Sequence, residues 1–237
     1  MKIAIFFHAR ISGGAHGPSP AFAGNPAIDP GWATAVVQEQ FSALYAAGLM
    51  DVADTMFIGL NGGASDYRIL KGMVPDANVI VHGEHAASEL PTMAFLENWV
   101  KDKNGWYVLY LHAKGVCWPP SKEGWELRQA WRRCMMHHVV INWTRCAHDL
   151  QAGYDMVGAH WLTSDKYNNA PAEALQRGIW GGNFWWSTSE YLRQLKPLQK
   201  DHRWSERYFA EMWPTNNRVP RVKDYAPHWP DLRDCIV

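Results

Sequence analysis

Two ionisable side chains end a run of strand-forming residues in the middle of the chain. Residues 107–111 read Tyr-Val-Leu-Tyr-Leu, and His112, Ala113, Lys114 and Gly115 follow. A short unbroken run of apolar and aromatic residues predicts a buried strand. An imidazole and an ammonium at its carboxyl end indicate an anionic ligand, most simply a phosphate. A structural role is the alternative, with Lys114 extending to solvent and His112 covering the core.

A second block with chemical potential lies downstream, at Gly181-Gly182-Asn183-Phe184-Trp185-Trp186. Adjacent residues of a strand point to opposite faces of a sheet. One of the two tryptophans is therefore expected to serve the core while the other faces a cleft, where its ring suits a sugar or a base. Asn183 would hydrogen-bond hydroxyl groups beside it. We therefore assign Asn183, Trp185 and Trp186 to acceptor binding, although most of the 14 tryptophans are expected in the core.

The elements that must position these residues alternate between strand and helix in the first half of the chain. Hydrophobic periodicity and the positions of proline and glycine predict strands at 2–8, 55–60, 78–81 and 107–112 and helices at 31–47 and from about 91 to 103. This alternation predicts an α/β fold with a mainly parallel central sheet and helices on both faces. At 237 residues and 47% hydrophobic content, the chain is expected to form a single domain.

The second half of the chain predicts longer and less regular elements. We expect a helical region at 125–150, a strand at 154–158, a helix cap at 187–190, a helix at 205–212 and an irregular tail after Pro214. The segment from 12 to 30 is rich in glycine and proline. Loops of that length in compact domains are commonly lids or binding loops.

Charge and terminal sequence limit the function classes. Lys plus Arg and Asp plus Glu number 23 each, so no global field attracts the chain to nucleic acid or to a membrane surface. No run of 18 apolar residues suits a membrane span, and the amino terminus lacks a signal-peptide pattern. These features predict a cytoplasmic protein with reduced cysteines.

Several blocks of the second half resemble those of glycosyltransferases related to the rhamnan synthesis F family. In that family a similar strand ends in His-Thr-Lys, so Ala113 is a departure. The blocks are Leu109–Gly115, Trp131-Arg132, Asp155–Gly158 and Gly182–Trp186, followed by Tyr191-Leu192 and Leu195. The resemblance spans Leu109 to Trp213 and implies a GT-A-like, Rossmann-like fold. It divides the single domain 1–237 into a nucleotide-sugar-binding half, 1–115, and an acceptor half with a carboxyl-terminal wrap, 116–237.

The resemblance implies an enzyme that moves a sugar from a nucleotide-activated donor to an acceptor hydroxyl. In most GT-A enzymes the fourth strand ends in Asp-x-Asp, which holds a divalent cation at the diphosphate. Here Lys114 stands in that place, and a fixed ammonium can stabilise the charge that develops on the leaving diphosphate. Arg132 would be a second contact, or else an ordinary solvated arginine. A divalent metal is therefore not expected; convergence of His82, His85 and His112 on an ion is the alternative.

Sugar transfer with inversion also needs a base for the acceptor's proton. The candidates are Asp155, Glu206 and Glu211. Glu211 resembles the carboxylate that follows the acceptor loop in inverting GT-A enzymes. The alternative role is an ion pair with Arg207, four residues earlier in the same helix. Asp155 is expected at the end of a short strand, and its alternative is a structural bond to the tail.

The donor is expected at the carboxyl ends of the first strands, where open α/β sheets bind ligands. That rule adds His8, Arg10 and Asn61 to the donor-binding set, together with His112, Lys114 and Arg132. The partners expected are a nucleotide sugar and a hydroxyl-bearing acceptor, either a glycan or a modified nucleobase.

Other functions fit the same residues. A carbohydrate- or nucleic-acid-binding module without catalysis would use the aromatic side chains alone. A transferase that glycosylates a modified DNA base stays open, because local basic residues could steer that acceptor, whereas generic nucleic-acid binding is not expected. A hydrolase would pair Asp155 with Glu211 but leave Lys114 without a task.

Overall fold

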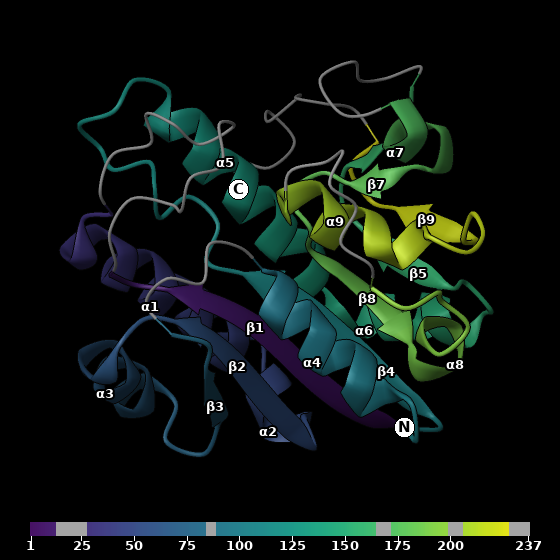
Figure 1. Cartoon of the computed structure of the whole chain (residues 1–237), viewed down its shortest axis with the longest axis horizontal. Coiled ribbons are helices and arrows are strands. Elements are labelled where there is room, and N and C mark those ends of the chain that lie inside the picture. Colours follow the sequence, from purple (N-terminus) through teal and green to yellow (C-terminus); the bar gives the residue numbers. More distant parts are fainter. Residues whose placement is uncertain (13–27, 84–88, 165–171, 199–205, 228–237) are drawn as a thin grey trace.

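A seven-stranded sheet runs through the molecule (Figure 1). The computed structural model describes residues 1–12, 28–83, 89–164, 172–198 and 206–227. The strands of the sheet are β1 (Lys2–Arg10), β2 (Thr55–Asn61), β3 (Asn78–Val81), β4 (Trp106–His112), β5 (Met156–Gly158), β8 (Trp185–Thr188) and β9 (Val222–Asp224). Their order is β3-β2-β1-β4-β8-β5-β9. All neighbours pair in parallel except β8, which is antiparallel to β4 and β5. The prediction of an α/β fold with a mainly parallel central sheet is confirmed.

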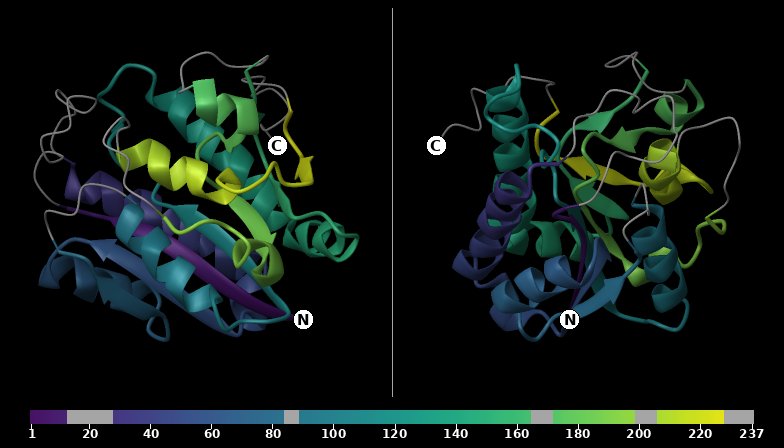
Figure 2. Two further views of the ribbon diagram at one scale, coloured as in Figure 1. Left: turned by 45° about the vertical axis from the view of Figure 1, so that its right-hand side comes forward. Right: turned by 60° about the vertical axis from the view of Figure 1, so that its left-hand side comes forward.

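Helices cover both faces of the sheet, as predicted (Figures 1 and 2). One core layer joins the sheet to α1, α3, α5 and α6, and the other joins it to α4, α8 and α9. The helices are α1 (Pro30–Ala46), α2 (Leu49–Val52), α3 (Ala64–Met73), α4 (Leu90–Val100), α5 (Trp125–Met136), α6 (Trp143–Gln151), α7 (Ala172–Arg177), α8 (Ser189–Leu192) and α9 (Glu206–Met212). A separate pair, β6 (Trp161–Leu162) and β7 (Ile179–Trp180), lies beyond the sheet.

Strand β1 is central because both of its faces are apolar. Ile5 and Phe7 enter the core layer with α1, and Ala4 and Phe6 enter the layer with α4. In the parallel register, His8 lies beside His112 of β4, and Arg10 lies beside Asn61 of β2. The polar residues that end these strands therefore meet at one edge of the sheet, as the sequence predicts.

Several elements differ from the sequence-based expectations. The helical region after Trp125 contains a π-helical segment, His137–Ile141, between α5 and α6. Helix α3 was not expected, and the tail after Pro214 contributes the edge strand β9. Cys134 is disulfide-bonded, so the expectation of reduced cysteines is wrong at this position, whereas Cys117 and Cys146 are reduced thiols. Most of the expected binding loop, residues 13–27, lies outside the described residues.

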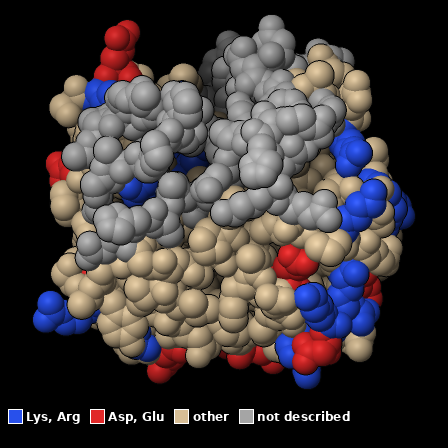
Figure 3. Space-filling model, viewed as in Figure 1, with Lys and Arg blue, Asp and Glu red and all other residues tan. Residues whose placement is uncertain are grey.

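The face of the molecule over α4 carries few charged side chains (Figure 3). The partly buried aromatic residues Phe57, Phe95 and Trp99 pack together there around Phe6, with ring centroids 5.0–6.0 Å apart. Within the described part of the chain, every helix is too short or too polar to traverse a lipid bilayer.

Gly59 of β2 lets α4 approach the sheet. A Cβ atom there would lie 1.9 Å from the Thr92 Oγ1 and 2.7 Å from the His82 Nε2. We predict that Gly59→Ala lowers the free energy of unfolding by about 1–3 kcal/mol, because overpacking forces neighbours to move. Urea denaturation measures this. The control is Gly72→Ala in α3, where nothing lies within 4 Å, and which is expected to stabilise by about 0.5–1 kcal/mol. Equal stability of the two variants would contradict the packing argument.

Candidate active site

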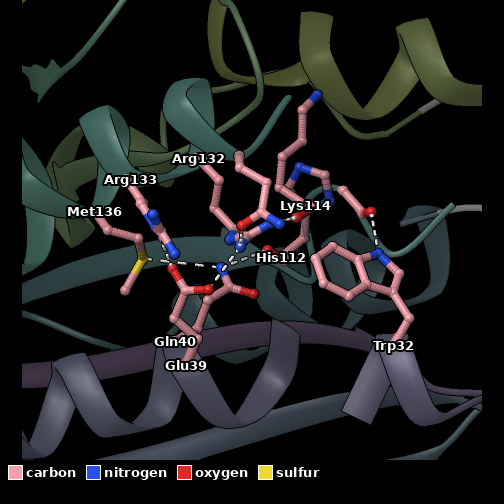
Figure 4. Close-up of polar contacts among 10 residues, drawn as sticks. Trp32, Glu39, Gln40, His112, Lys114, Arg132, Arg133 and Met136 are labelled. Atoms are coloured by element: carbon pink, nitrogen blue, oxygen red, sulfur yellow. Dashed lines mark hydrogen bonds and ion pairs between the residues drawn. The ribbon is translucent and has the colours of Figure 1, made fainter. Parts of the chain in front are cut away.

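The turn that follows β4 is held by side chains from two helices (Figure 4). Gln40 of α1 donates to the His112 carbonyl oxygen at 2.9 Å. Arg132 of α5 donates to the Lys114 carbonyl oxygen at 3.1 Å, and Trp32 of α1 donates to that of Gly115, also at 3.1 Å. Three of the four carbonyl groups from 112 to 115 are thus fixed by distant side chains. The backbone of Lys114 is therefore set by packing against α1 and α5.

Arg132 is fully buried and acts as a bridge in this turn. Its guanidinium donates to Glu39 and to Gln129, each at 2.7 Å, in addition to the Lys114 carbonyl. Gly115 has φ +93°, and a Cβ atom there would lie 2.9 Å from an Arg132 terminal nitrogen. A guanidinium enclosed in this way has no surface for a ligand. The expectation that Arg132 contacts the donor is corrected: it holds Lys114 in position.

The Lys114 side chain extends away from α1 (Figure 4). Its ammonium lies 4.0 Å from the centroid of the Trp131 ring, a cation–π contact. The buried His160 packs edge-on to the same indole, with ring centroids 6.5 Å apart. Burial, with smaller contributions from His138 and Lys114, lowers the pKa of His160 to about 4, so its ring is neutral near pH 7. Lys114 is thus placed by an aromatic face as well as by its backbone.

Arg10 brings a second cation to this edge of the sheet. Burial raises the pKa of the Cys117 thiol, and the nearby charges of Arg10, Lys122 and Lys114 oppose that rise. Arg10 is the last residue of β1, and Lys114 follows the end of β4, which is parallel to β1, so both cations belong to the same edge of the sheet. Two cations at one edge favour an anionic ligand there.

His8 and Asn61 lie beneath these cations in a buried polar chain. The His8 Nδ1 lies 2.8 Å from the Thr92 hydroxyl, and the His82 Nε2 lies 3.2 Å from the same oxygen. Asn61 Nδ2 approaches the His8 Nε2 at 3.4 Å. Burial, only partly offset by Glu89, lowers the pKa of His8 to about 3, and burial also lowers that of His82. Both rings are therefore neutral near pH 7.

Glu89, which the sequence-based reasoning missed, joins this site from the start of α4. Its Oε2 accepts hydrogen bonds from the Tyr110 hydroxyl at 2.7 Å and from Asn183 Nδ2 at 2.9 Å. Its Oε1 lies 3.6 Å from the His112 Nδ1. The signal available in the sequence was a carboxylate directly before a helix whose first turn contains proline. That local pattern does not indicate which strands the carboxylate contacts.

The tryptophan block is part of the core. Trp185 and Trp186 point to opposite faces, as predicted, but both are fully buried. Trp185 stacks on Tyr110 at 5.3 Å, and Trp186 donates to the Val139 carbonyl oxygen at 2.7 Å. Asn183, itself buried, bridges Glu89 and the Trp185 indole. The expectation that one indole faces a cleft is therefore corrected, and the bonds of Asn183 serve the framework of the site.

Asp155 lies at the opposite edge of the sheet from Lys114. It precedes β5, which runs parallel to β4, so it stands at the amino-terminal end of these strands. Its carboxylate accepts two hydrogen bonds from Arg218, at 2.7 and 2.8 Å, and one from the Arg221 backbone at 2.7 Å. This geometry favours the alternative in which Asp155 fastens the tail, and it separates Asp155 from the catalytic residues expected at the other edge.

Glu211 is buried in α9, which packs on α4 and β7. Phe209, Ala210 and Trp213 of the same segment enter the core layer with α4. Among the described residues, no three His, Cys, Asp or Glu side chains are grouped to hold a metal ion. His85, one of the three histidines considered for a metal, lies outside the described residues.

No protein-family model and no curated protein sequence matches the chain, so the resemblance to the rhamnan synthesis F family stays a prediction. The structure is similar to a Desulfovibrio desulfuricans G20 protein assigned as a nucleotide-diphospho-sugar transferase, at 15% identity and TM-score 0.46, covering 96% of this chain and 81% of that one.

Two further solved structures match with lower TM-scores. HddC from Yersinia pseudotuberculosis matches at 10% identity and TM-score 0.44, covering 96% of this chain and 91% of that one. S. aureus TarS 1–349 matches at 8% identity and TM-score 0.39, covering 96% of this chain and 59% of that one. At these identities and TM-scores the matches assign no activity to this chain.

The ion pair between the buried Arg132 and the partly exposed Glu39 gives a pH-dependent stability. Burial alone would raise the pKa of Glu39, but Arg132 and Arg133 outweigh it and lower the pKa. A carboxylate whose pKa is lower folded than unfolded stabilises the protein above its unfolded pKa, about 4.3, and loses this effect as pH falls through the folded value. We predict that Glu39→Gln is less stable than wild type near pH 7 and that the difference shrinks below about pH 4.5.

Urea denaturation across that pH range measures the difference. Glu123→Gln, at an exposed position, is the matched control and is expected to change stability by less than about 0.5 kcal/mol. A Glu39→Gln deficit that persists undiminished at acid pH would contradict the ion-pair assignment.

Proposed function

We propose that this chain is a glycosyltransferase that moves a sugar from a nucleotide-activated donor to an acceptor hydroxyl. The nucleotide-sugar-binding half is 1–115, and the acceptor half with its carboxyl-terminal wrap is 116–237. The observation that carries the proposal is the placement of Lys114. Its backbone is fixed by α1 and α5, and its ammonium lies on Trp131 at the carboxyl edge of the sheet.

A preorganised cation stabilises charge that develops in a transition state without reorganising during the reaction. As the bond between the sugar and the diphosphate breaks, its electron pair stays on the terminal phosphate oxygen. We assign Lys114 to that oxygen and Arg10, which shares the surroundings of Cys117, to the diphosphate. His8, Asn61 and His112 complete the donor end of the site.

The acceptor oxygen forms the new bond to the sugar, and its proton passes to a carboxylate. We propose Glu211 as that base, because it is buried in α9 and α9 packs on α4, the helix that Glu89 directly precedes. Asp155 is not retained in this role, since it lies at the other edge of the sheet. Metal-independent transfer is part of the proposal, with Lys114 supplying the positive charge.

A cationic and aromatic surface leads to Lys114 and bears on the acceptor. The Lys122 ammonium lies 3.6 Å from the Trp118 ring centroid, and the Arg128 guanidinium lies 4.9 Å from Trp118 and 5.5 Å from Trp131. Alternating cations and indoles suit phosphates and stacked bases. This surface favours a hydroxyl on a modified DNA base as the alternative to a glycan acceptor.

A nucleoside diphosphate is expected to raise the Tm of the wild-type protein, because a ligand that binds only the folded state stabilises it. Lys114→Ala is expected to remove most of that shift. The matched control is Lys103→Ala, which removes a lysine that also lies over an indole, 5.5 Å from the Trp99 ring, but at the other end of the sheet. A shift of equal size in Lys114→Ala and wild type would end the assignment of this lysine.

Nucleotide release from a panel of nucleotide sugars tests the chemistry. We expect slow hydrolysis in the presence of EDTA, reduced about 100-fold or more by Lys114→Ala, as for the loss of one preorganised donor elsewhere. Turnover that appears only with manganese would overturn the metal-independent part. Binding of a free sugar without any nucleotide release would favour the binding module.

A further inference from the structure

The groups next to its two ring nitrogens determine where His112 carries protons. Its Nε2 lies 2.8 Å from the Gly182 carbonyl oxygen. A carbonyl oxygen only accepts, so Nε2 carries a proton. Its Nδ1 lies 3.6 Å from the Glu89 Oε1, at ion-pair distance. Whether Nδ1 carries a second proton therefore depends on the charge of Glu89.

Two hydrogen-bond donors converge on one oxygen of Glu89. The Tyr110 hydroxyl and the Asn183 amide both donate to Oε2. Burial and the adjacent Glu89 raise the pKa of Tyr110 well above its ordinary value, so its hydroxyl keeps the proton that it donates. A carboxylate beside Nδ1 favours a proton on that nitrogen.

We infer that Glu89 holds His112 as a doubly protonated imidazolium, a second positive charge beside Lys114 at the carboxyl end of β4. The catalytic role of this imidazolium rests on the proposed function. The imidazolium would stabilise the diphosphate as it leaves, in the same step as Lys114. Glu89 would be a positioning residue, since it acts on the substrate only through His112.

The other groups around His112 determine whether the charge is tolerated. From β1, His8 lies beside it in the register and is neutral, and Arg10 adds a like charge. His82, after β3, is also neutral near pH 7. Lys114, two residues onward, adds a second like charge, and the Phe184 ring packs edge-on at 5.4 Å. The Glu89 carboxylate faces the ring at Nδ1 and offsets these cations.

Nitrogen-15 NMR of the histidine rings tests the inference in the wild-type protein, without any assumption about activity. At pH 7 both nitrogens of His112 are expected to be protonated. In Glu89→Gln, a near-isosteric change, only Nε2 is expected to keep its proton. Glu126→Gln, an exposed carboxylate in the first turn of α5, is the control and should leave the ring unchanged. A singly protonated His112 in the wild type would overturn the inference even if no variant folds.

Kinetics test the catalytic part separately. Glu89→Gln is expected to lower kcat for nucleotide release about tenfold or more with little change in KM, because the charge matters most in the transition state. Its activity should also fall as pH rises through the ordinary histidine pKa of about 6.5, where the wild type retains activity.

The outcomes separate the two proposals. If His112 is doubly protonated in the wild type but Glu89→Gln has unchanged kinetics, the catalytic role of His112 is overturned. The ion pair between His112 and Glu89 would still stand. Absence of nucleotide release from wild type would overturn the proposed function, while the NMR result would still decide the charge of His112.

Discussion

The enclosed guanidinium of Arg132 is the constraint on which the proposed site depends. Removing such a group from water is costly unless charges and hydrogen bonds replace its hydration. Glu39, Gln129 and the Lys114 carbonyl oxygen do so here, and they belong to α1, to α5 and to the turn after β4. The geometry of that turn is therefore linked to the packing of two helices. Lys114 owes its position to a cation that itself never meets solvent.

The reversed direction of β8 brings the second half of the chain to the same edge. Because β8 is antiparallel to β4, the residues that precede it lie beside the carboxyl end of β4. Gly182 and Asn183 thus reach His112 and Glu89. A parallel strand in that place would present its carboxyl end instead. The direction of this one strand therefore determines which residues contact His112 and Glu89.

The sequence predicted the fold better than the site. Strand β3 has the predicted bounds, and the edge where His8 and His112 meet was anticipated from strand polarity alone. Arg132 was misjudged because its burial depends on Glu39, 93 residues away. The place of Asp155 depends on whether it begins or ends a strand, and a three-residue strand gives little periodicity to decide this. Glu89 was missed because its partners come from β4 and the segment before β8, and no local pattern joins them.

The hydroxyl of Thr92 stands between two imidazoles, and a hydroxyl has one proton to give. Since the Asn61 amide faces the His8 Nε2, the hydrogen of His8 resides on Nδ1 and points to Thr92, whose own hydrogen then points to His82. The two rings are consequently the same tautomer, each with its hydrogen on Nδ1, and the chain of bonds has a direction. Reversing it would require every hydrogen to move in concert and the amide to turn over, so this polarity is as much a property of the fold as the order of the strands.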